Sequence, residues 1–168
     1  MSACDRNGAT HALTIFANGI LDMCMKGLLS NIADIVFKPG FNATEKGAKR
    51  GEALAQFNLG LMYYKGRVAA QDYTEAVKWW RLAAGQGFAE ALNDLGMMYG
   101  NGDGVQQDNM EAYKWFDLAA SHHPQGRKQK KSMRDRDFLA NKMTAAQIAE
   151  AQRLAREWTA AFEKREKK

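Results

Sequence analysis

The chain contains one pattern twice, first as ALAQFNLGLMYYKGRVAAQDYTEAVKWWRLAA at residues 53–84 and then as AEALNDLGMMYGNGDGVQQDNMEAYKWFDLAA at residues 89–120. The two stretches align without a gap at a spacing of 36 residues, and 16 of their 32 positions are identical. A period of about 20 to 50 residues is typical of a stacked array, because one such unit cannot bury its own apolar face. The period therefore predicts a repeat architecture.

Each copy of the pattern divides into two helices joined by a short loop. In the first copy Ala55, Leu59, Met62 and Tyr63 recur at helical spacing, so we expect this face to point into the core. A glycine after each first helix fits a helix end, and an aspartate before each second helix fits a helix cap. The predicted helices are residues 52–65, 73–84, 89–101 and 109–121, with Gly66 and Gly102 as the ends and Asp72 and Asp108 as the caps.

These residues resemble the Sel1-like repeat, a relative of the tetratricopeptide repeat, in its bacterial form. The match runs from about residue 51 to 123, as repeats 51–87 and 88–123 within a region 43–123. One departure is visible, because Val68 stands where the second copy has Gly104, so the Gly-x-Gly-Val turn of the family occurs once. The resemblance implies an all-α fold, a short right-handed α-solenoid of helix-turn-helix repeats with flanking capping helices.

The N-terminal region, residues 1–42, is predicted to hold an amphipathic helix at 10–37 followed by a linker that continues to Arg50. Our preferred interpretation is a cap over the first repeat, since terminal units of solenoids are atypical. Peripheral membrane contact through 10–37 is the alternative. It is not favoured, because the polar face is not enriched in lysine or arginine. Asp22, Lys26 and Asp34 interrupt the apolar run, so we expect neither a secretory signal nor a membrane span, and a cytoplasmic location.

The C-terminal region continues the pattern in a weakened form. Residues 124–143 read as the helix of a degenerate third repeat, with Met133, Phe138 and Leu139 as its expected apolar contacts. Thr144 and Gln147 have the spacing of a capping box. The segment 144–168 is therefore predicted to be a closing, capping helix with a charged tail.

Composition fits one globular domain, with 46% hydrophobic and 26% charged residues in 168. The positive charge is uneven, because residues 1–125 carry a net charge of −2 and residues 126–168 carry +7. The cluster from Arg127 to Arg136 could attract phosphates, so nucleic-acid binding stays open as a disfavoured alternative. Cys4 and Cys24 match no metal or redox spacing and are expected to be free thiols.

No catalytic constellation, metal site or cofactor motif emerges from the sequence, and His122 and His123 are expected to occupy a turn or the surface. In superhelical arrays the first helices of successive units line a concave binding surface. We therefore expect a non-enzymatic adaptor or scaffold that binds a protein or peptide, and the alternative is a hydrolase acting on cell-wall-related or β-lactam substrates. The candidate contact residues of the concave face are Phe57, Asn58, Leu61, Tyr64, Asn93, Asp94 and Met97.

Overall fold

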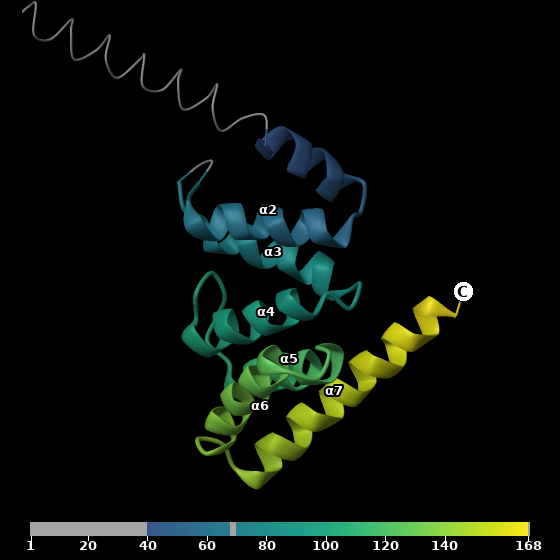
Figure 1. Ribbon diagram of the computed structural model, residues 1–168. Helices are drawn as coiled ribbons and strands as arrows, with labels where there is room; N and C mark the ends of the chain where they lie inside the picture. The colour runs from purple at the N-terminus through teal and green to yellow at the C-terminus, as the bar shows by residue number, and fades with distance from the viewer. Residues whose placement is uncertain (1–39, 68–69, 168) are drawn as a thin grey trace, which may run out of the picture. The chain divides into compact units, whose positions relative to one another are not determined.

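The structure, a computed structural model, describes residues 40–67 and 70–167, and all regular secondary structure in this part of the chain is helical (Figure 1). The helices named below lie within the unit Phe41–Lys168, and the helix predicted at 10–37 lies outside the described residues. The predicted repeat helices are confirmed to within one residue at each end. The helices are α2 (Ala53–Lys65), α3 (Tyr73–Ala84), α4 (Ala89–Asn101), α5 (Asn109–His122), α6 (Arg127–Ala140) and α7 (Ala145–Glu166).

The helix ends have the local chemistry that the sequence predicts. The Asp72 carboxylate accepts a hydrogen bond from the backbone N–H of Glu75 at 2.9 Å. Asp108 accepts from two backbone N–H groups, at 2.8 and 3.1 Å. Thr144 and Gln147 form the predicted capping box at the start of α7. These caps satisfy backbone donors that have no partner inside the helix, so each second helix begins at a defined residue.

The repeats stack so that each helix packs on the next along the chain (Figure 1). α2 pairs with α3 and α4 pairs with α5, while α3 packs against α4 to join the two repeats. The third unit departs from this scheme, because α6 and α7 both pack on α5 and make few contacts with each other within the described residues. The chain is thus a short α-solenoid whose last two helices close it on the second repeat.

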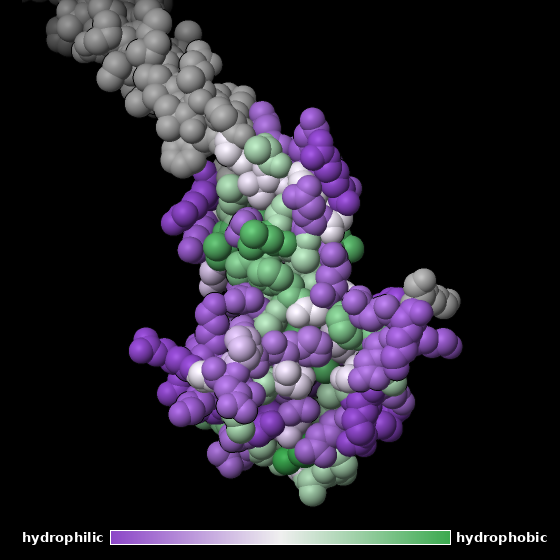
Figure 2. Space-filling model, turned by 45° about the vertical axis from the view of Figure 1, so that its right-hand side comes forward, coloured by the Kyte–Doolittle hydropathy of each residue, from purple (hydrophilic) through white to green (hydrophobic). Residues whose placement is uncertain are grey.

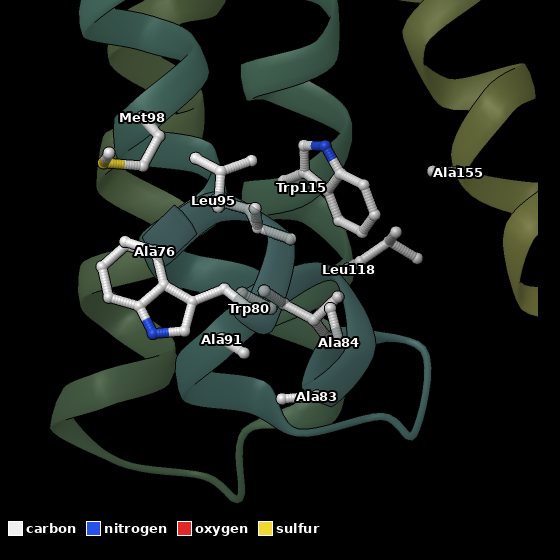
Figure 3. Packing of buried hydrophobic residues seen from close by; sticks show 13 residues of the cluster. Ala76, Trp80, Ala83, Ala84, Ala91, Leu95, Met98, Trp115, Leu118 and Ala155 are labelled. Carbon is white, nitrogen blue, oxygen red and sulfur yellow. The ribbon is translucent and has the colours of Figure 1, made fainter. Parts of the chain in front are cut away.

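A tryptophan from the first repeat lies at the centre of the core (Figure 3). Trp80 is fully buried among alanines and Leu95, and its ring N–H donates to the carbonyl of Phe57 at 3.1 Å. A Cβ at Gly60 would lie 2.6 Å from the Trp80 ring, so only glycine lets α2 approach α3 this closely. Further along, Trp115 and Leu118 join the same cluster, to which Ala155 of α7 also belongs.

The first repeat also has a helical neighbour on its N-terminal side, where a linker was predicted. Residues 40–49 are helical. Gln56 donates a hydrogen bond from its amide to the carbonyl of Ala48 at 3.2 Å, and the rings of Phe41 and Tyr63 lie 6.3 Å apart. Because α2 has neighbours on two sides, its fully buried residues are Gln56, Leu59 and Gly60, whereas Ala55, Met62 and Tyr63 are only half-buried.

The apolar contacts of the third unit differ from the prediction. Leu139 is buried as expected, but Met133 and Phe138 are 40% and 58% exposed. The buried side of α6 instead carries Ser132, because α5 and α4 approach that side. α7 is helical as predicted, with Ala151 and Ala155 as its buried residues.

Hydropathy is unevenly distributed over the surface of this unit. On the face shown in Figure 2, hydrophobic side chains gather at the level of α2 and α3, whereas the part toward the C-terminal helices is mostly polar. The polar part agrees with the charge of the sequence, which concentrates its basic residues after residue 125. Apolar contacts are therefore available at the level of α2 and α3, and polar contacts toward the C-terminal helices.

Candidate functional site

The first helices of successive units, α2, α4 and α6, together form one pocket with a volume of about 180 Å³. We call it the A-helix pocket. Each of the three helices contributes side chains, so the pocket exists only when the repeats are stacked. Its lining residues are Phe57 from α2, Glu90, Asn93 and Asp94 from α4, Lys128 and Lys131 from α6, and His123 from the end of α5.

One wall of the A-helix pocket is aromatic and held by the core. The Phe57 ring is half-buried and lies 5.0 Å from the ring of Phe88 and 6.3 Å from that of Trp80. Packing on two sides fixes the orientation of the Phe57 ring. The wall therefore offers an apolar contact at little cost in side-chain entropy.

A hydrogen-bonded chain of side chains links α6 to the pocket residues Asn93 and Asp94 of α4. The hydroxyl of Ser132, which is fully buried, donates to the side-chain carbonyl of Asn93 at 3.0 Å. The Asn93 amide in turn donates to Asp94 at 3.4 Å. This arrangement orients the Asn93 amide and leaves acceptor positions of the Asp94 carboxylate open to a ligand.

Asp94 has an unusual titration for a carboxyl group. Burial raises its pKa to about 6, against the opposing effects of the hydrogen bond from Asn93 and the charge of Lys131. It forms no ion pair with the described residues. A desolvated carboxylate of this kind gains from a hydrogen-bond donor or a cation supplied by a partner.

The rim of the pocket carries charges of both signs. Lys128 pairs with Glu90 at 2.6 Å, and Lys131 pairs with Asp135 at 2.7 Å. His123 lies in the bend after α5, as the expected turn position allows, but it is only 6% exposed, and burial lowers its pKa. The sequence offered no signal for this, because the 36-residue period aligns His123 with Gly87, which has no side chain.

The structure separates the seven candidate contact residues into groups. Phe57, Asn93 and Asp94 lie together in the A-helix pocket. Leu61 and Tyr64 are half-buried and pack against the core, and Met97 lines a different cavity, of about 290 Å³. Asn58 is half-buried and lines neither. The side chains that sequence reasoning missed are His123 and the α6 lysines, which only the packing of α6 brings to α4.

Among the residues that the structure describes, no helix combines the length and the apolar character needed to cross a bilayer.

Comparison with known proteins agrees with the all-helical repeat fold. The Sel1 repeat family matches at residues 53–88 and again at 89–123. The structure is similar to c5321, a protective antigen of uropathogenic Escherichia coli with an SLR fold, at 30% identity and a TM-score of 0.68 over 79% of this chain. It is also similar to a Sel1 repeat protein from Oxalobacter formigenes, at 32% identity and a TM-score of 0.56 over 66% of this chain.

The similarity covers only part of those two proteins, 29% of the first and 45% of the second. No curated protein matches the chain. Sel1 repeats are typically protein–protein interaction modules, and stacked repeats of this kind present extended binding surfaces. The described residues thus form a short α-solenoid that contains two Sel1 repeats.

Proposed function

We propose that the chain is a non-enzymatic adaptor that binds a protein or an extended peptide at the A-helix pocket. The observation that carries this proposal is that three successive first helices, α2, α4 and α6, line one pocket. Stacked repeats use such shared surfaces to contact partners that no single unit could hold.

The side chains of the pocket suit a polypeptide. An extended peptide needs hydrogen bonds for its backbone and apolar contacts for its side chains. Asn93 and Asp94 supply the hydrogen-bonding groups, and Phe57 supplies the apolar wall. Glu90, Lys128 and Lys131 form a polar rim, as protein interfaces commonly have. Binding by these groups requires only that the partner fit the shape of the pocket and contact a few of its side chains, and it involves no chemical step. A purified protein that hydrolysed a β-lactam or a peptidoglycan fragment would contradict this proposal.

Nucleic-acid binding is a second candidate because of the exposed face of α6. Arg127, Lys130 and Arg134 form no ion pair among the described residues and line a shallow groove. The other basic residues of this helix are paired with carboxylates, among them Arg136 with Asp117 at 2.8 Å. Binding to a single-stranded oligonucleotide that weakened steeply with salt would favour this candidate, since phosphate contacts release counterions.

Site-specific photo-crosslinking tests the main proposal. A photoreactive phenylalanine analogue replaces Lys131, which is exposed at the rim of the pocket, in the full chain expressed in its native cell. The matched control carries the same analogue at Lys78, which is exposed on α3 outside the pocket. We expect a distinct crosslinked protein from position 131 and none from position 78. Identical crosslinks from both positions would contradict the assignment of the pocket.

The partner identified in this way then allows a quantitative test. We expect Asn93→Ala combined with Asp94→Ala, both in the A-helix pocket, to weaken its binding at least tenfold, or about 1.4 kcal/mol. Asp103→Ala, in the loop between α4 and α5, is the control and should leave the affinity unchanged. An affinity unaffected by the double substitution would place the binding surface elsewhere on the chain.

A further inference from the structure

The second repeat lacks an aromatic cluster that the first repeat has. In the first repeat, the ring of Tyr64 lies 5.3 Å from the ring of Tyr73 and 5.5 Å from that of Trp80. The 36-residue period places Gly100, Asn109 and Phe116 at the corresponding positions of the second repeat. Two of the three rings are therefore missing there, and the third is smaller.

The backbone around these positions is the same in both repeats. Gln71 donates from its amide to the carbonyl of Tyr64 at 2.8 Å, and Gln107 donates to the carbonyl of Gly100 at 2.7 Å. The capping aspartates also match, because the backbone N–H of Asp72 donates to the carbonyl of Tyr63 at 3.1 Å and that of Asp108 donates to the carbonyl of Tyr99 at 2.9 Å. The repeats thus differ here in their side chains and not in their frame.

A cavity occupies the place of the missing rings. It has a volume of about 290 Å³ and is lined by Gly100, Asn109 and Phe116, together with Met97 and residues of α6. This is several times the ~30 Å³ that a water molecule takes up in the liquid. A Cβ at Gly100 would lie 3.7 Å from the Cβ of Ala112, an ordinary contact, so the backbone there has room for a side chain.

The walls of this cavity are suited to an aromatic ring. Phe116 and Leu139, which are 5% and 6% exposed, contribute apolar surface on two sides. Phe138 lines it as well, is 58% exposed, and has the Lys142 ammonium 4.2 Å from its ring centroid. The Asn109 side chain has no hydrogen-bond partner among the described residues, so it can pair with a phenol hydroxyl.

We propose that this cavity binds an aromatic side chain, foremost tyrosine, presented by a partner polypeptide. The ring of the partner would occupy the position that Tyr64 fills in the first repeat. This inference rests on the proposed function, because it assigns an anchor pocket to the same polypeptide partner. Aromatic side chains that enter desolvated pockets contribute a large share of binding energy at protein interfaces.

A pair of small probes tests the preference of the cavity. N-acetyl-tyrosinamide and N-acetyl-leucinamide are titrated separately into the full-length protein, and binding is followed by the NMR signal of the Met97 methyl group. We expect the tyrosine probe to bind at least tenfold more tightly than the leucine probe. Equal affinities would overturn the proposal, and so would tighter binding of adenosine, which would indicate a nucleobase as the occupant.

A pair of variants at Gly100 locates the probe. Gly100→Tyr copies the first repeat, fills the cavity, and should weaken binding of the tyrosine probe at least tenfold. Gly100→Ala also replaces the glycine of the helix but leaves the cavity open. Its affinity for the tyrosine probe should therefore stay within twofold of the wild-type value. Asn109→Tyr copies Tyr73 and provides a second way to block the site if Gly100→Tyr does not fold. Unchanged affinity in a folded blocking variant would overturn the proposal.

Failure of this inference can be told apart from failure of the proposed function. Crosslinking at Lys131 and the double substitution at Asn93 and Asp94 report on the A-helix pocket without involving the cavity. If those experiments succeed while the tyrosine probe shows no preference, only the cavity assignment is wrong. If the probe binds as expected while crosslinking at Lys131 fails, the cavity is a binding site and the A-helix pocket is not.

Discussion

The two Sel1 repeats share one backbone frame and use it to hold different side chains. The identical positions include Asp72 and Asp108 as helix caps and Gly60 and Gly96 as close helix contacts. Most positions that line the A-helix pocket or the cavity at Gly100 differ between the repeats. Phe57 is replaced by Asn93, Asn58 by Asp94, and Tyr64 by Gly100. The comparison indicates that the period preserves the scaffold, while the differences between repeats create the places where a ligand can bind.

The largest expected effect comes from removing the central ring of each repeat. Trp80→Ala should lower the free energy of unfolding by about 4 kcal/mol, and Phe116→Ala by about 3 kcal/mol. Trp80 is packed on all sides, whereas Phe116 already borders a cavity and so makes fewer contacts to lose. Urea denaturation of both variants measures the difference. A larger loss for Phe116→Ala would break the comparison.

A second experiment, Asp94→Asn, gives the second repeat the residue type that the first repeat has at the corresponding position, Asn58. Burial raises the pKa of Asp94 to about 6 from 3.8, so the folded protein holds this proton more tightly than the unfolded chain does. The stability of the wild type should therefore fall as the pH rises from about 4 through 6. Asp94→Asn should be more stable than the wild type by roughly 1 to 3 kcal/mol at pH 7.5.

The stability difference between Asp94→Asn and the wild type at low pH serves as the control for this experiment. At pH 3.5 the wild-type Asp94 is mostly protonated in both states, so the advantage of Asp94→Asn should largely vanish. Urea denaturation at several pH values checks this dependence. A difference in stability that stays constant with pH would show that ionisation of Asp94 is not its cause.

The helix caps test whether the shared frame is equally strong in both repeats. Asp108 accepts two backbone hydrogen bonds and Asp72 accepts one. We expect Asp108→Ala to cost about 1.5 kcal/mol and Asp72→Ala about 1 kcal/mol of stability. Thermal unfolding of both variants, with serine substitutions as controls that retain a capping oxygen, measures the difference. A cost near zero for either alanine would contradict its role as a cap.

The smallest expected effect concerns a surface position that differs between the repeats. Glu90 pairs with Lys128, whereas the corresponding residue of the first repeat, Leu54, is 60% exposed. Because Lys128 is largely exposed, Glu90→Leu should change the free energy of unfolding by less than about 0.5 kcal/mol. A loss well above this, measured by urea denaturation, would mean that the ion pair fixes α6 on α4.

Local features of the fold could be predicted from the sequence with good accuracy. The bounds of the four repeat helices, the caps at Asp72 and Asp108, and the capping box at Thr144 all depend on neighbouring residues. The linker predicted at residues 41–50 was wrong for the opposite reason. Contacts of Phe41 and Ala48 with α2 accompany a helix there, and these contacts join residues 22 and 8 positions apart, farther than a capping pattern extends.

The candidate site was only partly predictable. Phe57, Asn93 and Asp94 were placed on the expected face by helical periodicity, and the structure brings them together. His123 could not be added because the period aligns it with Gly87, and the lysines of α6 could not because no period relates α6 to the complete repeats. Met133 and Phe138 were expected to be apolar contacts and are exposed, since α6 packs on α5 through a different side.

The sequence by itself determined the repeat, its helices and their caps, because these follow from patterns within about 36 residues of chain. Only the tertiary structure decided where a missing side chain leaves a cavity and which helices share a pocket. The cavity at Gly100 exists because the second repeat has no ring at the position of Tyr64 and α6 forms a wall of the space that is left. The A-helix pocket exists because α2, α4 and α6 meet. Both depend on distances between helices, which packing sets and a single period cannot encode.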